Sequence, residues 1–105
     1  MKEDLLKIIN HYGVMSQLKH FQSEVFELNE AIIRFEEAKK NYFEGYGLQQ
    51  HNLEKHIAEE IADVLVMLKQ FQYYYGIEDK NIDKNIEEIM KYKVERQLER
   101  INKGE

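Results

Sequence analysis

Apolar side chains recur at steps of three and four residues along most of the chain, which is the spacing of one helical face. The longest apolar row runs through residues 14–40, and two more rows run through residues 53–75 and 80–102. A shorter row covers residues 3–10. The pattern therefore predicts three long amphipathic helices preceded by a short N-terminal helix.

The residues of the three long rows are those that we expect to form the core. They are Val14, Leu18, Phe21, Val25, Leu28, Ile32 and Phe35 in the first row, Leu53, Ile57, Ile61, Val64, Leu65, Leu68, Phe71 and Tyr75 in the second, and Ile82, Ile86, Ile89, Met90, Val94, Leu98 and Ile101 in the third. Glycines mark the predicted helix ends, at Gly13, at the patch Gly45–Gly47 and at Gly76. Asp79 or Asn81 is placed to cap the last helix.

Composition supports an all-α fold. The chain has 105 residues, no proline and no cysteine, and 43% of its residues are apolar. Proline breaks helix interiors, so its absence favours long helices. The length predicts one domain, residues 1–105, built as a helical bundle. A core this small is commonly supplemented by subunit pairing, so we expect a homodimer or homotetramer.

The charge balance excludes some partners. Fifteen basic and 20 acidic residues give a formal net charge of −5, whereas a nucleic-acid binder needs a cationic surface. We therefore expect no nucleic acid polymer as a partner. The N-terminal residues do not form a signal peptide, and no apolar run is long enough to span a bilayer. The sequence predicts a cytoplasmic protein with no membrane partner.

Four carboxylates hold the most informative positions. Glu24 and Glu27 are three residues apart on the first long helix, and Glu60 and Asp63 are three apart on the second, so each pair shares a helix face. Both pairs border the apolar row. If the two helices pack antiparallel, the four side chains converge, and a divalent cation such as Mg²⁺ or Mn²⁺ would relieve their repulsion. From spacing alone, solvated surface carboxylates at the edge of the row are an equally good interpretation.

A di-iron site is a different interpretation of an acidic helical bundle, and its signature is Glu-x-x-His on paired helices. The residues three positions before the four histidines are Ile8, Gln17, Leu48 and Leu53. None of them is glutamate, so the sequence does not carry this signature.

The combined pattern resembles the MazG-like, all-α nucleoside triphosphate pyrophosphohydrolases, whose signature is Glu-Glu-x-x-Glu followed a helix later by Glu-x-x-Asp. Gly13-x-x-x-Gln17, then Glu24-x-x-Glu27-Leu28, then Glu59-Glu60-Ile-Ala-Asp63-Val-Leu, then Tyr75-Gly-Ile77 carry the resemblance. It extends over about residues 12–100. Two features depart from the family pattern: Ser23 replaces the first glutamate, and 32 residues separate Glu27 from Glu60, which is longer than usual. We expect the extra length in the connection 41–50.

The resemblance implies hydrolysis of a nucleoside triphosphate to the monophosphate and pyrophosphate, in cleansing or regulating the nucleotide pool. It implies Mg²⁺ as cofactor, with Mn²⁺ as a substitute, held by Glu24, Glu27, Glu60 and Asp63. Ser23 raises the alternative of a nucleotide-binding or interaction module with weak or no catalysis. A purely structural helical oligomer is a third hypothesis.

Substrate-binding residues follow less directly. Lys93, Arg96 and Arg100 lie at helical steps on one side of the last predicted helix, and family members carry basic residues in that helix. A solvated basic face that pairs with Glu95 and Glu99 is at least as good an interpretation for any one of them.

Base recognition has two expected contributors. Gln17 matches a family position and is suited to hydrogen bonding with a base edge. His20 either stacks on the base, as Tyr12 could, or occupies the helix edge. Phe21 belongs to the core, because it lies in the middle of the apolar row.

Overall fold

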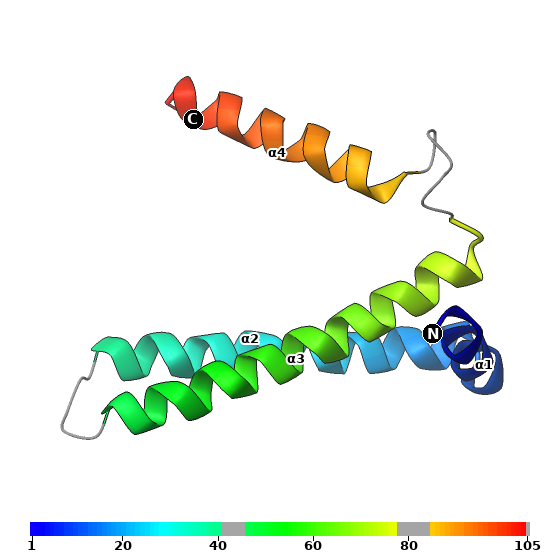
Figure 1. Cartoon of the computed structure of the whole chain (residues 1–105), viewed down its shortest axis with the longest axis horizontal. Helices are drawn as coiled ribbons and strands as arrows, with labels where there is room; N and C mark the ends of the chain where they lie inside the picture. The colour runs from blue at the N-terminus through cyan, green and yellow to red at the C-terminus, as the bar shows by residue number, and fades with distance from the viewer. Residues whose placement is uncertain (41–45, 78–84, 105) are drawn as a thin grey trace. The chain divides into compact units, whose positions relative to one another are not determined.

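The computed structural model of the protein describes residues 1–40, 46–77 and 85–104, with the side chains of 46–49 excepted. The described residues form helices and no strand, which confirms the all-α prediction (Figure 1). The helices are α1 (Lys2–Tyr12), α2 (Val14–Lys40), α3 (Tyr46–Tyr74) and α4 (Ile86–Asn102). The chain divides into two compact units, Met1–Phe71 and Gln72–Glu105.

The bounds of α2 coincide with the predicted range, whereas α3 begins earlier than expected. Its first residue is Tyr46, so Gly47 lies in the first turn of a helix rather than in a turn between helices. The penalty for one glycine in a helix is only about 1 kcal/mol, which a 29-residue helix readily outweighs. The last helix has Asn85 as its N-cap, and its side chain accepts a hydrogen bond from the Glu88 backbone N–H at 3.3 Å. The suggested cap residues Asp79 and Asn81, together with Gly45 and Ile82, lie outside the described residues.

Gly13 turns the chain from α1 into α2. Its φ angle is 89°, in the left-handed region that glycine adopts without steric cost, and its N–H donates to the Ile9 carbonyl at 2.8 Å. This sharp turn lets α1 pack against α2 (Figure 1). Leu5 and Ile9 of α1 are buried as a result, and they anchor α1 beside the first turns of α2.

Helices α2 and α3 run side by side in opposite directions (Figure 1). Gln17, near the start of α2, contacts Gln70, near the end of α3, and further along both helices Glu24 lies beside Glu60 and Asp63. The side chains buried along the described parts of the two helices are largely polar: Gln17, Ala31, Glu60, Met67, Gln70 and Gln72. Helices α2 and α3 therefore pack against each other through the polar row, which borders the apolar row in the sequence.

The predicted core row is consequently wrong for much of its length. Six of its members on α2 and α3 keep between 38% and 51% of their surface exposed: Leu18, Val25, Ile32, Ile61, Leu65 and Leu68. The other members of the row on these two helices are half-buried, and among them the Phe21 ring meets that of Phe71 edge to face at 5.8 Å. Helices α2 and α3 contact each other through their polar rows. The apolar row lies beside this contact on each helix, so the partner helix does not cover it.

Helix α4 is exposed over almost its whole length. Apart from the half-buried Ile86, all of its residues are exposed, including the apolar Ile89, Val94, Leu98 and Ile101. Nowhere in the described part of the chain is a helix both long enough and apolar enough to cross a membrane.

Candidate metal centre

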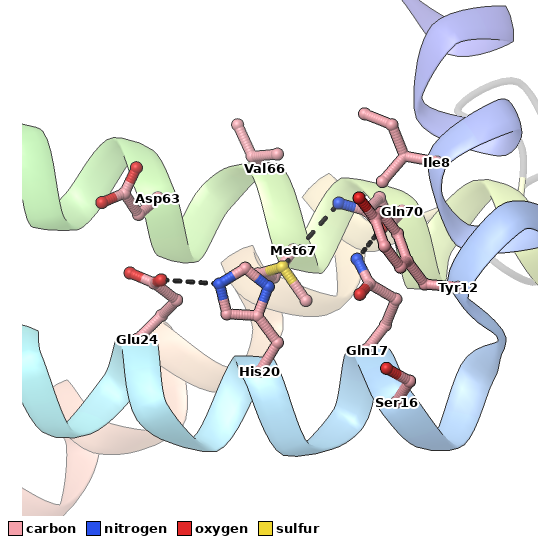
Figure 2. Close-up of a pocket in the computed structure, with 10 residues that line it drawn as sticks. All are labelled: Ile8, Tyr12, Ser16, Gln17, His20, Glu24, Asp63, Val66, Met67 and Gln70. Atoms are coloured by element: carbon pink, nitrogen blue, oxygen red, sulfur yellow. Dashed lines mark hydrogen bonds and ion pairs between the residues drawn. The ribbon is translucent and has the colours of Figure 1, made fainter.

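Three carboxylates converge where α2 and α3 pass each other. Glu24 projects from α2, and Glu60 and Asp63 project from α3, with one oxygen of each within 4.8 Å of the other two. Figure 2 shows the Glu24 side chain projecting from α2 toward the part of α3 that carries Asp63. The i, i+3 spacing of Glu60 and Asp63 places both on the side of α3 that faces α2. The antiparallel helices therefore bring together three of the four predicted ligands.

The two glutamates of this triad are largely withdrawn from solvent. Glu60 keeps only 7% of its surface exposed, and the Glu24 side chain keeps 14%. The Oε2 atoms of both residues are buried and have no hydrogen-bond partner. An unsatisfied buried carboxylate oxygen is costly to desolvate. The described residues supply no hydrogen-bond partner to these two atoms, which is consistent with a place for a cation.

Glu60 shows the electrostatic consequence of this crowding. Burial raises the pKa of its carboxyl above the ordinary value of 4.5, and the nearby charges of Glu27, Asp63 and Glu24 raise it further. His56 acts in the opposite direction and lowers the pKa. Neighbouring like charges in a buried place disfavour ionisation. A cation bound among these groups would remove that penalty.

Glu27 lies near the triad but not within it. Its charge acts on Glu60, and the two residues line a hollow of about 290 Å³ together with His56 and Arg34. The structure thus places Glu27 beside Glu60, whereas Glu24 and Asp63 face a different and larger cavity.

That larger cavity has a volume of about 530 Å³. One end is formed by Glu24 and Asp63, and apolar side chains from α1 and α3 contribute to its walls (Figure 2). Its lining residues are Ile8, Tyr12, Ser16, Gln17, His20, Glu24, Asp63, Val66, Met67 and Gln70. Two predicted substrate-binding residues, Gln17 and His20, therefore share a cavity with two predicted metal ligands. A mostly apolar cavity with a few convergent polar groups is typical of a small-molecule site.

Gln70 is a lining residue that the sequence analysis missed. It accepts a 2.8 Å hydrogen bond from Gln17 and directs its own amide toward the Met67 sulfur at 3.7 Å (Figure 2). The row His56, Glu60, Asp63 and Met67 continues to Gln70 at the next helical step. Extending that row by three residues would have identified it.

The basic residues of α4 belong to the other unit of the chain. Lys93, Arg96 and Arg100 line a shallow hollow of about 200 Å³ together with Gln97. Their shared face agrees with the helical spacing in the sequence. Their role toward a substrate stays a prediction.

The donor set suits a hard divalent cation. All three triad residues offer carboxylate oxygens, which Mg²⁺ and Mn²⁺ prefer. Oxygen ligands at about 2.1 Å from Mg²⁺ are at most about 4.2 Å apart, so small side-chain rotations would bring atoms now within 4.8 Å onto one ion. The unpartnered Oε2 atoms of Glu24 and Glu60 are the strongest reason to consider an ion at this place.

Comparisons of the chain with models of known protein families, with curated proteins and with solved structures found no match, and the case for a function therefore depends on the residues of this site.

Proposed function

We propose that the protein is a Mg²⁺-dependent nucleoside triphosphate pyrophosphohydrolase of the MazG-like class. The observation that carries the proposal is the carboxylate triad of Glu24, Glu60 and Asp63, with two buried unpartnered oxygens, at one end of a cavity of about 530 Å³. The resemblance of the Glu24–Glu27 and Glu60–Asp63 pattern to that family supports the same conclusion. Mn²⁺ would substitute for Mg²⁺, because it accepts the same oxygen ligands.

The reaction is the hydrolysis of a phosphoric anhydride. The oxygen of a water molecule forms a bond to the α-phosphorus, the bond from that phosphorus to the bridging oxygen breaks, and pyrophosphate leaves. A bound divalent cation neutralises phosphate charge and lowers the pKa of water. Glu24, Glu60 and Asp63 would hold the cation, and Glu27 would add negative charge beside Glu60. Catalysis then consists mostly of positioning and electrostatic stabilisation.

The rest of the cavity suits a nucleoside. Gln17 offers its carboxamide to a base edge, and Tyr12 and His20 provide flat rings for stacking. The triphosphate would point toward the acidic end, where Glu24, Glu60 and Asp63 would hold the cation. The basic face of α4, with Lys93, Arg96 and Arg100, is the proposed partner of the phosphate oxygens.

We further propose that the protein is a homodimer or homotetramer. The exposed apolar row on α2 and α3 supports this part of the proposal, because six large side chains on it remain at least 38% exposed. Large exposed apolar patches mark interaction surfaces. A second copy of the chain offers an identical row, as expected for a two-fold symmetric interface.

One sequence feature favours a second candidate function. Ser23 stands where the family signature has a glutamate, so the site has one carboxylate fewer than the signature prescribes. A protein that binds the metal–nucleotide complex with little or no turnover is the alternative. Binding of a non-hydrolysable deoxynucleoside triphosphate without product formation would select it.

The proposed activity is tested by incubating the purified full chain with each canonical and damaged (d)NTP in Mg²⁺, in Mn²⁺ and in EDTA. Phosphorus NMR distinguishes pyrophosphate from inorganic phosphate. We expect monophosphate and pyrophosphate in equal amounts from at least one substrate, and none in EDTA. If none of the substrates tested releases pyrophosphate, the enzymatic proposal is ruled out.

Two variants make the test specific to the triad. The double change Glu60→Gln with Asp63→Asn is expected to abolish pyrophosphate release while circular dichroism remains helical. Glu59→Gln removes one charge from an exposed neighbour on the same helix and is expected to retain activity. Activity in the double variant would show that the metal assignment is wrong.

A further inference from the structure

The two glutamates of the triad have similar local settings. Each is preceded by a histidine four residues earlier on its own helix: His20 before Glu24 on α2, and His56 before Glu60 on α3. Residues four apart are neighbours on a helix surface. His20 Nε2 donates a 2.8 Å hydrogen bond to Glu24 Oε1 (Figure 2), and His56 Nδ1 lies 3.9 Å from Glu60 Oε1.

The two oxygens of each carboxylate are therefore in different situations. In both residues the histidine approaches Oε1, whereas Oε2 is buried and unpartnered. A carboxylate gripped through one oxygen has less freedom to rotate. Its other oxygen is then held in a fixed direction, and in both residues that oxygen is the buried, unpartnered one of a carboxylate that belongs to the triad.

We propose that His20 is a positioning residue, which holds Glu24 by Oε1 so that Oε2 is presented to a divalent cation, and that His56 acts on Glu60 in the same way through a longer and weaker contact. This inference rests on the proposed metal site and goes beyond it, because neither histidine is itself a ligand. Hydrogen bonds to ligating carboxylates are known to set ligand orientation and metal affinity.

The two histidines differ in the strength of their contact with the glutamate. The His20 contact is within hydrogen-bonding distance, and the His56 contact is longer than a hydrogen bond. Both imidazoles are accessible, with 54% and 42% of their side chains exposed, so replacing either one leaves the packing of α2 and α3 largely undisturbed. We therefore expect the larger effect from changes at His20.

The experiment measures binding of Mn²⁺ alone to the full chain, by electron paramagnetic resonance of the free ion and by calorimetry, with no nucleotide present. Loss of a hydrogen bond to a metal ligand lowers metal affinity by about 10- to 100-fold, and we expect His20→Leu to fall in this range. His20→Gln keeps a donor at the position of Nε2 and is expected to restore most of the affinity. His20→Asn has a shorter reach and is expected to restore little.

At His56 the contact is made by Nδ1, so asparagine rather than glutamine is the replacement that keeps a donor. His56→Asn keeps a donor near the position of Nδ1, and His56→Leu removes it, with an expected loss smaller than that of His20→Leu. His51→Leu changes an exposed histidine elsewhere on α3 and is the matched control. Circular dichroism verifies that each variant is folded.

The outcomes separate this inference from the proposed function. Wild-type affinity in folded His20→Leu and His56→Leu would overturn the positioning role while leaving the metal site intact. Equal losses in His20→Gln and His20→Leu would also overturn it, because a donor at that position would then have no value. Absence of Mn²⁺ binding by the wild-type chain would overturn both the positioning role and the metal site.

Discussion

Gln17 and Gln70 join α2 to α3 through a buried hydrogen bond, in which Gln17 Nε2 donates to Gln70 Oε1 at 2.8 Å. The two residues are 53 positions apart in the sequence, and they keep only 4% and 2% of their surfaces exposed. A polar pair so deeply buried fixes the alignment of the two helices, because sliding one along the other would leave both carboxamides without partners.

The first prediction concerns this pair. Gln17→Leu alone leaves the Gln70 carbonyl oxygen without its donor, and we expect a loss of about 1–3 kcal/mol in the free energy of unfolding. The double change Gln17→Leu with Gln70→Leu is expected to lose less than the sum of the single changes, since no buried amide is then left unsatisfied. Urea unfolding of the four proteins measures the coupling. Additive losses would show that the hydrogen bond does not couple the helices.

The second prediction concerns pH. Burial and neighbouring carboxylates raise the pKa of Glu60 above 4.5, so the folded chain holds this proton more tightly than the unfolded chain. The resulting stabilisation is fully present below pH 4.5 and is lost as the pH rises through the raised pKa. In EDTA, the stability of wild type relative to Glu60→Gln is therefore expected to fall as the pH rises from 4.5 toward neutrality.

Urea unfolding at a series of pH values tests this expectation, and the comparison with Glu60→Gln cancels the groups that titrate in both proteins. A difference that does not change with pH would mean that Glu60 ionises normally in the folded chain. Adding Mg²⁺ is expected to stabilise the wild type at neutral pH by about 2.7 kcal/mol when the ion is at 100 times its Kd.

The third prediction concerns subunit association. Leu65 is 51% exposed in the apolar row of α3, and Leu65→Lys would place a charge in the proposed interface. We expect this change to shift the protein from oligomer to monomer in analytical ultracentrifugation. Asn52→Lys adds the same charge at an exposed polar position of α3 outside the apolar row and is expected to leave the oligomer intact. A wild-type chain that sediments as a monomer would contradict the proposal directly.

The fourth prediction concerns the phosphates. Lys93→Ala is expected to raise KM for the nucleoside triphosphate by about 10- to 100-fold, in keeping with the value of a hydrogen bond to a charged group. Lys91→Ala changes a nearby exposed lysine of α4 that lies outside the basic hollow and serves as the control. Equal effects of the two changes in steady-state kinetics would mean that α4 contributes only general positive charge.

The helices could be predicted from the sequence because the apolar rows have helical spacing throughout. The bounds of α2 followed from Gly13 at one end and the end of the apolar row at the other. The start of α3 did not, because Gly47 resembles a turn residue locally, whereas the length of the helix outweighs its weak propensity.

The convergence of Glu24, Glu60 and Asp63 was also predictable, since each pair shares a helix face and the faces meet when the helices are antiparallel. The sequence did not predict which row of side chains on α2 and α3 is buried. Periodicity identifies which residues lie on one face, but it does not tell whether that face meets another helix of the same chain. Leu18 and Leu65 are apolar and exposed, whereas Gln17 and Gln70 are polar and buried, and only the packing of α2 on α3 distinguishes them.

The proposed role of the polar row between α2 and α3 conflicts with thermal stability. Apolar side chains at Glu24 and Glu60 would relieve two unpartnered buried oxygens and strengthen the helix pair, at the expense of the acidic site. A library of this protein screened only for heat resistance is therefore expected to accumulate apolar residues at these two positions. A second screen would select for both heat resistance and turnover. Positions that retain a carboxylate only in the second screen would be identified as functional.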